Sequence, residues 1–254
     1  MLPQWLSAQQ AALELLVKHE IKNVQGFAVD QFENIFLVKN ESLVKWNDEF
    51  KEQAAYSNPI NGTITHIDVV NALNPYVFYS EVNQIEVLDR MLNLSQSVNL
   101  FEWDLLDVPL ISFSDQEHVW AYNQSANKLQ RVNLQSGQVS NQSVNLASLQ
   151  EEAVPVQLLS TVDHVFLLVP SSGIWHFDAL GALVEQIQLP DVQYFTVRGN
   201  SLYYLQQNNV FRYDLKLAKN ELLLKAGQQT VQLKVVGKKL YLLTLNQLQV
   251  YRIL

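Results

Sequence analysis

The 254-residue sequence contains no cysteine. Disulfides, thiolate metal sites and a cysteine nucleophile are therefore excluded. Basic residues are also scarce, with 17 Lys and Arg against 25 Asp and Glu, and the longest basic run is Lys238-Lys239. A nucleic-acid partner is not expected from a chain with a net charge of -8 and no basic cluster, because such binding depends on neutralising phosphates.

Long apolar runs are missing as well, and no stretch approaches the ~18 residues that a membrane-spanning helix requires. The N-terminus resembles the end of an export signal, because Leu6 and Ala8 stand where small or aliphatic residues precede a cleavage site. Cleavage there leaves Gln9 as the new terminus, although the basic part and most of the apolar part of a signal are absent. The alternative is an ordinary helical or frayed leader over residues 7–16.

We expect residues 1–8 to be the remnant of an export signal and residues 9–254 to form one domain. The protein is then periplasmic or secreted, and it is cytoplasmic if the signal interpretation fails. We expect a monomer.

Motifs that carry chemistry are absent too. There is no His-x-His, His-Glu-x-x-His, EF-hand loop, Gly-x-Ser-x-Gly elbow or glycine-rich phosphate loop, and the eight glycines are scattered in turns. His118 and His164 precede equivalent strands of successive repeats. Equivalent positions of neighbouring repeats diverge outward in a ring. The two histidines therefore need not both come within the ~2 Å nitrogen-to-zinc distance that a shared zinc ion requires. We predict surface histidines, no metal site, no catalytic residue and no cofactor.

What the sequence does contain is a repeat in which an aliphatic residue is followed by an aromatic one. Its copies start 42, 42, 46, 37 and 38 residues apart. A second apolar segment follows each copy, and in the first five copies it is followed by Asn or Asp, residues that end strands and begin turns. The six copies start at Ile35, Val77, Val119, Val165, Leu202 and Leu240.

A further predicted strand precedes each pair, and a weaker fourth strand follows the first five pairs. The preceding strands are predicted at Gln25–Val29, Ile64–Val70, Pro109–Phe113, Pro155–Leu159, Gln193–Val197 and Thr230–Val236.

Four antiparallel strands repeated about every forty residues predict an all-β, six-bladed β-propeller. A sheet that is apolar on both faces buries them only by stacking on its neighbours, and a closed ring leaves no end blade exposed. The sixth copy supplies three strands before the chain ends. We predict that Leu13–Ile21 fills the last position and closes the ring.

The segment Gly26-Phe27-Ala28-Val29-Asp30, followed by Asn34-Ile35-Phe36-Leu37-Val38, resembles the NHL-type repeat of six-bladed propellers of the TolB-like class. The family's usual glycine before the Asn is Glu33 here, and only the first copy matches well. The resemblance implies the architecture and carries no catalytic residue.

One predicted inter-blade loop, Leu100–Val108, is apolar, aromatic and acidic at once. Such a segment either packs back against the barrel or forms a binding surface for a partner. We take Phe101, Glu102, Trp103, Asp104 and Asp107 as the candidate partner-binding residues.

A second loop, residues 150–155, contributes Glu151 and Glu152. These carboxylates and Asp191 form a candidate acidic rim at the mouth of the channel, together with those of the first loop. The alternative is a solvated acidic edge, because exposed charges interact weakly.

The sequence therefore favours a non-catalytic exported propeller that binds a protein or glycan through one loop face. The alternative is a lactonase-like or hydrolase-like enzyme with a calcium ion over the central channel, held by Asp, Asn and Glu oxygens. That alternative rests on analogy with other six-bladed propellers alone.

Overall fold

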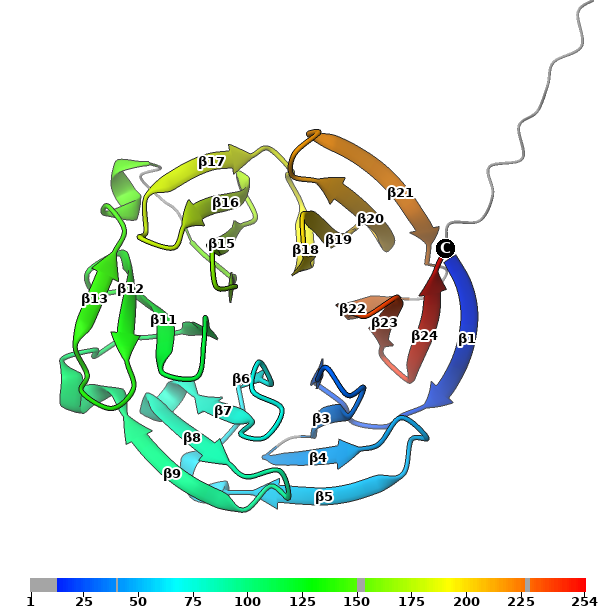
Figure 1. The fold of residues 1–254 in the computed structure, drawn as a ribbon, viewed down its shortest axis with the longest axis horizontal. Helices are drawn as coiled ribbons and strands as arrows, with labels where there is room; N and C mark the ends of the chain where they lie inside the picture. The colour runs from blue at the N-terminus through cyan, green and yellow to red at the C-terminus, as the bar shows by residue number, and fades with distance from the viewer. Residues whose placement is uncertain (1–12, 40, 150–153, 227–228) are drawn as a thin grey trace, which may run out of the picture.

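Six antiparallel sheets, each of four strands, surround a central axis as the blades of a propeller (Figure 1). The computed structural model describes residues 13–39, 41–149, 154–226 and 229–254. Each of blades one to five is complete before the chain begins the next, and its innermost strand comes first. The predicted all-β, six-bladed propeller is confirmed.

Every blade has the same four positions from the axis outward, and the blades are numbered one to six along the chain. The innermost strands are β2 (Gly26–Val29), β6 (His66–Asp68), β10 (Leu110–Phe113), β14 (Gln157–Ser160), β18 (Val192–Arg198) and β22 (Thr230–Val236). The second strands are β3 (Ile35–Lys39), β7 (Tyr76–Tyr79), β11 (His118–Asn123), β15 (His164–Val169), β19 (Ser201–Gln206) and β23 (Lys239–Thr244). The third strands are β4 (Ser42–Trp46), β8 (Gln84–Leu88), β12 (Lys128–Asn133), β16 (Gly173–Asp178), β20 (Asn209–Asp214) and β24 (Gln247–Ile253). The outer strands are β5 (Glu52–Ser57), β9 (Leu94–Asn99), β13 (Val139–Gln142), β17 (Leu183–Ile187), β21 (Lys219–Lys225) and, for blade six, β1 (Leu13–Glu20).

Short 3-10 helices occupy some of the loops. They are η1 (Pro59–Asn61), η2 (Ser80–Val82), η3 (Leu100–Trp103) and η4 (Leu146–Ser148). Among the described residues, no helix is long and apolar enough to cross a membrane.

The two ends of the chain close the ring together. β1 pairs antiparallel with β24, from Leu13 opposite Ile253 to Glu20 opposite Gln247. The prediction that the N-terminal segment completes the sixth blade is confirmed. A helical leader is excluded for residues 13–16, which belong to β1; residues 1–12 lie outside the described part.

The Asn and Asp residues that follow the third strands do fold onto the backbone of the next turn, as predicted. The Asp89 carboxylate accepts hydrogen bonds from the amides of Met91 and Asn93 at 2.8 and 2.9 Å. Similar side-chain bonds are made by Asn47, Asn133, Asp178 and Asp214. These turns hold the third and outer strands of each blade in register.

The second blade departs most from the predicted boundaries. A strand was expected over Ile64–Val70, and the structure has the three-residue β6 (His66–Asp68). Asp68 Oδ1 accepts a 2.8 Å hydrogen bond from the amide of Val70, and this side-chain turn ends the strand.

The core consists of clusters of buried apolar side chains between neighbouring blades. The aromatic residues of the repeat belong to it, and Phe36, Phe78, Trp120, Phe166 and Trp175 are fully buried. Each such side chain contributes roughly 1.5–3 kcal/mol of transfer free energy. Packing between blades accounts for the repeat, as the sequence predicted.

The antiparallel order gives the ring two distinct faces. The outer strand of one blade ends on the face where the innermost strand of the next begins, and the turn between second and third strands lies there too. We call this the connection face. The opposite side, where the innermost strand of each blade turns into the second, is the turn face.

Candidate functional site

The inter-blade loop singled out in the sequence joins β9 to β10 on the connection face, and η3 forms its first half. Asn99 Oδ1 caps η3 by accepting a 2.9 Å hydrogen bond from the Phe101 amide. Leu100, Leu105 and Val108 are buried in the cluster between blades two and three. The aliphatic half of the loop therefore folds back on the barrel.

Trp103 fixes the middle of this loop. It is half-buried against the same cluster and lies over Gly137, in the turn between β12 and β13. A Cβ at Gly137 would overlap the Trp103 ring. Trp103 therefore holds the loop to blade three.

The remaining candidate residues of the loop face solvent. Phe101 is 44% exposed and Leu106 is 60% exposed, and Glu102, Asp104 and Asp107 are exposed as well. The loop thus presents two apolar side chains among three carboxylates on a backbone that is anchored from below.

The residues of the predicted acidic rim are not brought together at the channel among the described residues. Glu151 and Glu152 lie outside the described residues. Asp191 is exposed just before β18, and its amide donates to Pro170 O at 3.4 Å. Asp104, Asp107 and Asp191 are not among the described residues that line the central channel. In the described part of the chain, no three His, Asp or Glu side chains are grouped so that they could hold a metal ion.

His118 is half-buried and is engaged within its own blade. Its Nδ1 lies 3.0 Å from Asp115 Oδ1. The same Asp115 carboxylate accepts a hydrogen bond from Arg131 at 2.7 Å.

His164 is likewise half-buried, and its Nδ1 lies 2.9 Å from Nε2 of His176 in the same blade. The other ring nitrogen of His176 lies 3.3 Å from Glu185 Oε1. Burial lowers the pKa of His176, and His164 lowers it further, while Glu185 opposes the shift.

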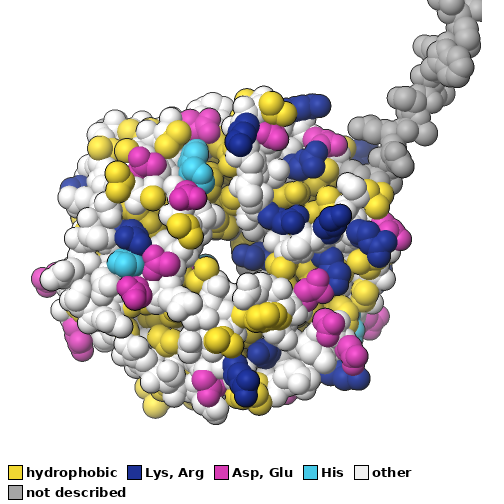
Figure 2. Space-filling view, viewed as in Figure 1, with side chains coloured by type: hydrophobic (Ala, Val, Ile, Leu, Met, Phe, Trp, Pro, Cys, Tyr) yellow, Lys and Arg dark blue, Asp and Glu magenta, His cyan; other side chains and the backbone are white. Residues whose placement is uncertain are grey.

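The sequence reasoning placed an acidic rim or a calcium ion at the central channel but did not single out the residues of the channel wall. A cavity of about 360 Å³ runs along the axis and is lined by residues of all six innermost strands. Figure 2 shows the opening at the centre of the molecule. Charged residues within the predicted innermost strands, such as Asp68 and Lys234, were the available signal.

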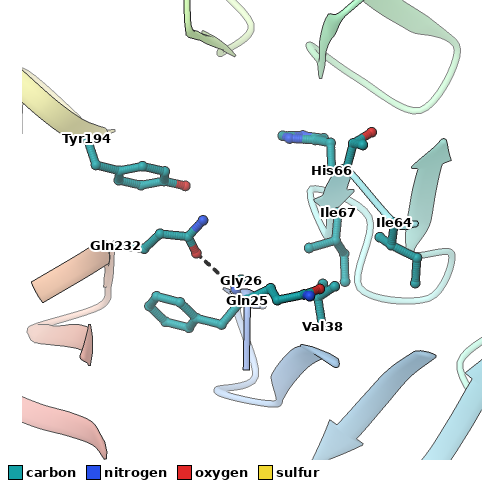
Figure 3. Close-up of a pocket in the computed structure, with 10 residues that line it drawn as sticks. Gln25, Gly26, Val38, Ile64, His66, Ile67, Tyr194 and Gln232 are labelled. Atoms are coloured by element: carbon teal, nitrogen blue, oxygen red, sulfur yellow. Dashed lines mark hydrogen bonds between the residues drawn. The ribbon is translucent and has the colours of Figure 1, made fainter. Parts of the chain in front are cut away.

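A smaller hollow of about 90 Å³ adjoins the channel beside blade one. Tyr194 and His66 point toward one another across this hollow, and Gln232 reaches into it beside Tyr194 (Figure 3). Gln232 Oε1 accepts a 3.0 Å hydrogen bond from the Phe27 amide, which ties β22 to β2.

Electrostatics in the channel centre on Asp68 and Lys234. Burial alone would raise the pKa of the Asp68 carboxyl, but His66, Lys234 and the Val70 amide hold it below its usual value. Burial lowers the pKa of the Lys234 ammonium group, and the charge of Asp68 offsets part of that change. Burial and Asp68 raise the pKa of Tyr194 to about 12, so its hydroxyl stays protonated.

No family model and no curated protein sequence matches this chain. Solved structures match its shape. The Pan2 WD40 domain of Neurospora crassa superposes with a TM-score of 0.65 at 10% identity, covering 91% of this chain and 89% of that one. A streptogramin B lyase superposes with a TM-score of 0.66 at 10% identity, covering 94% of this chain and 98% of that one.

A third similar structure is BBS1N in complex with ARL6DN, with a TM-score of 0.62 at 15% identity; the match covers 92% of this chain and 79% of that one. At such identities the likeness establishes the propeller fold alone. It does not single out the NHL or TolB-like class, and the similar structures include both a WD40 domain and an enzyme.

Proposed function

We propose that this chain is a non-catalytic, exported propeller that binds a partner protein through the 100–108 loop on its connection face. The supporting observation is the division of that loop. Leu100, Leu105 and Val108 anchor it in the core, while Phe101 and Leu106 remain exposed. Exposed apolar side chains on a fixed backbone lose little conformational entropy when a partner covers them.

The charge around these two side chains indicates the chemistry of the partner. Glu102, Asp104 and Asp107 belong to the same loop and are exposed. Other exposed carboxylates on loops of the connection face are those of Glu41, Glu81 and Asp191. We therefore propose a partner surface with an apolar pocket for Phe101 and Leu106, rimmed by Lys or Arg. Such complementarity contributes to specificity and association rate.

The fold is compatible with this role, because one similar structure, BBS1N, was solved in complex with ARL6DN. That complex belongs to BBS1N and supports the proposal only by analogy.

Site-specific photo-crosslinking tests the loop directly. Benzoylphenylalanine replaces Phe101 in the full chain, and the protein is irradiated in an extract of the source cells. We expect an adduct of one defined size, whose partner is then identified and purified. The double variant Phe101→Ser with Leu106→Ser should weaken binding of that partner about tenfold or more, as the loss of central apolar contacts does.

A matched control comes from the turn face. Phe32 and Val162 are 63% and 73% exposed and lie in turns between an innermost and a second strand, so the double variant Phe32→Ser with Val162→Ser removes similar apolar surface from the other side. It should leave the affinity unchanged. Equal loss in both double variants, or an adduct also formed from position 162, contradicts the assignment to the loop. An adduct that glycosidase treatment removes identifies a glycan as the partner.

The exported location rests on the signal-like residues 1–8. We propose that cleavage before Gln9 accompanies export. Cell fractionation of the natural full-length product, with mass spectrometry of its N-terminus, tests this part separately. A cytoplasmic product that begins at Met1 contradicts it.

A further inference from the structure

The register of the strands places one residue of each blade at the same depth in the channel. Lys234 of β22 pairs with Tyr241, and Ala28 of β2 pairs with Phe36, the equivalent residue of its blade. The full layer, from blade one to blade six, is Ala28, His66, Ser112, Leu159, Thr196 and Lys234. Blade one separates His66 from Lys234 in the ring, and its alanine leaves open space between them.

The two carboxylates of the channel wall are already occupied by backbone amides. Asp68 accepts from the amides of Val70 and Phe113 at 2.8 and 3.2 Å. Asp30 accepts from Phe32 and Asn34 at 2.9 Å. Both carboxylates are therefore held in place by hydrogen bonds within the chain itself.

The donors of the wall are not occupied in this way. In the described part of the chain, no carboxylate lies within ion-pair distance of Lys234 or of Arg198 at the end of β18. His66 Nε2 is buried and lies 3.9 Å from Asp68 Oδ2, too far for a hydrogen bond, and it has no other partner among the described residues. Gln232 uses its oxygen for the Phe27 amide, and its NH₂ group has no hydrogen-bond partner among residues 13–39, 41–149, 154–226 and 229–254.

We propose that this channel binds a small polyhydroxylated monocarboxylate, a sugar acid of the uronic or aldonic kind. Its carboxylate contacts Lys234, with Arg198 at the mouth, and its hydroxyls meet Tyr194, Gln232 and His66. Charge-assisted hydrogen bonds of this type are about twice as strong as neutral ones. The cavity of about 360 Å³ falls within the ~300–1,000 Å³ range of small-molecule sites.

The charge balance of the wall selects a single negative charge. Lys234 and Arg198 line the channel together with Asp68 and Asp30, so a monoanion gains the attraction of two cations that form no ion pair with the described residues. A phosphate dianion adds a second charge close to Asp68, which costs free energy in a partly desolvated site. Lys and Arg side chains also gather over β18–β24 on the face shown in Figure 2, and they favour the approach of anions.

Titration calorimetry with the purified full chain tests the proposal, using gluconate and galacturonate as probes and galactose as the neutral comparison. We expect both acids to bind and galactose to bind about tenfold more weakly or not at all, given the strength of hydrogen bonds to charged groups. Affinity for the acids should fall as the pH rises, because Lys234 loses its charge.

Two variants locate the site. Lys234→Met keeps the apolar stem and should reduce affinity for galacturonate about tenfold or more. Lys238→Met, in the exposed turn after β22, is the matched control and should change it less than about twofold. Tyr194→Phe removes one hydroxyl and should cause an intermediate loss; it carries the test if the Lys234 variant does not fold.

Several results would overturn the proposal. They are no binding of either acid, binding of galactose as tight as that of galacturonate, or equal effects of the Lys234 and Lys238 variants. Tighter binding of inorganic phosphate than of either acid assigns the channel to a different anion. None of these outcomes bears on the 100–108 loop, so this test and that of the proposed partner are independent.

Discussion

The indole of Trp103 covers Gly137 so closely that no side chain fits between them. Gly137 also has a φ of +69°, a conformation in which a Cβ is strained. A loop between blades two and three is thus held by a glycine in the outer turn of blade three. This contact links the proposed binding surface to the stability of the ring.

Gly137→Ala should therefore destabilise the protein and loosen the loop. Gly199→Ala is the matched control, because Gly199 also has a positive φ, +55°, but nothing lies within 4 Å of its added Cβ. We expect Gly137→Ala to cost about 1–3 kcal/mol more than the control, from steric overlap. Urea unfolding measures the free energy of unfolding of both variants. Equal losses of stability would show that the close contact between Trp103 and Gly137 does not stabilise the protein.

Acidification should weaken the fourth blade. The pKa of His176 is lowered in the folded state by burial and by His164, so the unfolded chain binds the proton more readily. Stability is then fully present above the unfolded pKa of about 6.5 and is lost as the pH falls toward the folded value. Thermal melts between pH 8 and pH 5 should show a decline of a few degrees in the native protein. That decline should shrink in His176→Gln, and an unchanged slope in this variant contradicts the assignment.

Calcium should leave the melting temperature unchanged. The described residues contain no cluster of three potential ligands, and Lys234 lies in the channel wall, where a cation would be repelled. A ligand present at a hundred times its Kd stabilises by about 2.7 kcal/mol, so binding in millimolar calcium is easily detected in a thermal melt. A clear rise would revive the calcium-dependent enzyme as an explanation.

Removal of β1 should open the ring. A chain lacking residues 1–20 exposes the edge of β24, which is otherwise paired from Gln247 to Ile253. Exposed edges pair with other chains, so we expect dimers or larger species in light scattering, together with a lower melting temperature. A chain lacking only residues 1–8 is the control and should remain monomeric. A monomeric, equally stable product of the larger deletion contradicts the closure role.

Much of the fold was predictable because it repeats. A mean spacing near forty residues, the aromatic of each second strand and the Asn or Asp after each third strand are local signals, and each copy confirms the others. The closing strand at Leu13–Glu20 followed from counting strands. The shortening of β6 was not predicted, because the hydrogen bond from Val70 to Asp68 depends on a turn that apolar patterning does not reveal.

The residues of the channel wall were not predicted because their proximity depends on ring closure. Asp68 and Lys234 belong to the second and sixth blades, far apart in the chain, and only ring closure brings them to either side of blade one. The 100–108 loop was predicted as a whole, whereas its division between core and surface depends on packing against blade three. Sequence composition alone does not separate Leu105, which is buried, from Leu106, which is not.

The pairing of β1 with β24 also sets an order of events during synthesis. β1 is synthesised before its partner strand β24. At roughly 5–20 residues per second, the time between the synthesis of the two strands is on the order of 10–50 s. During this time β1 has no partner strand within its own chain. Its unpaired edge is then open to pairing with other chains, so this interval is the one in which the folding chain is most exposed to aggregation.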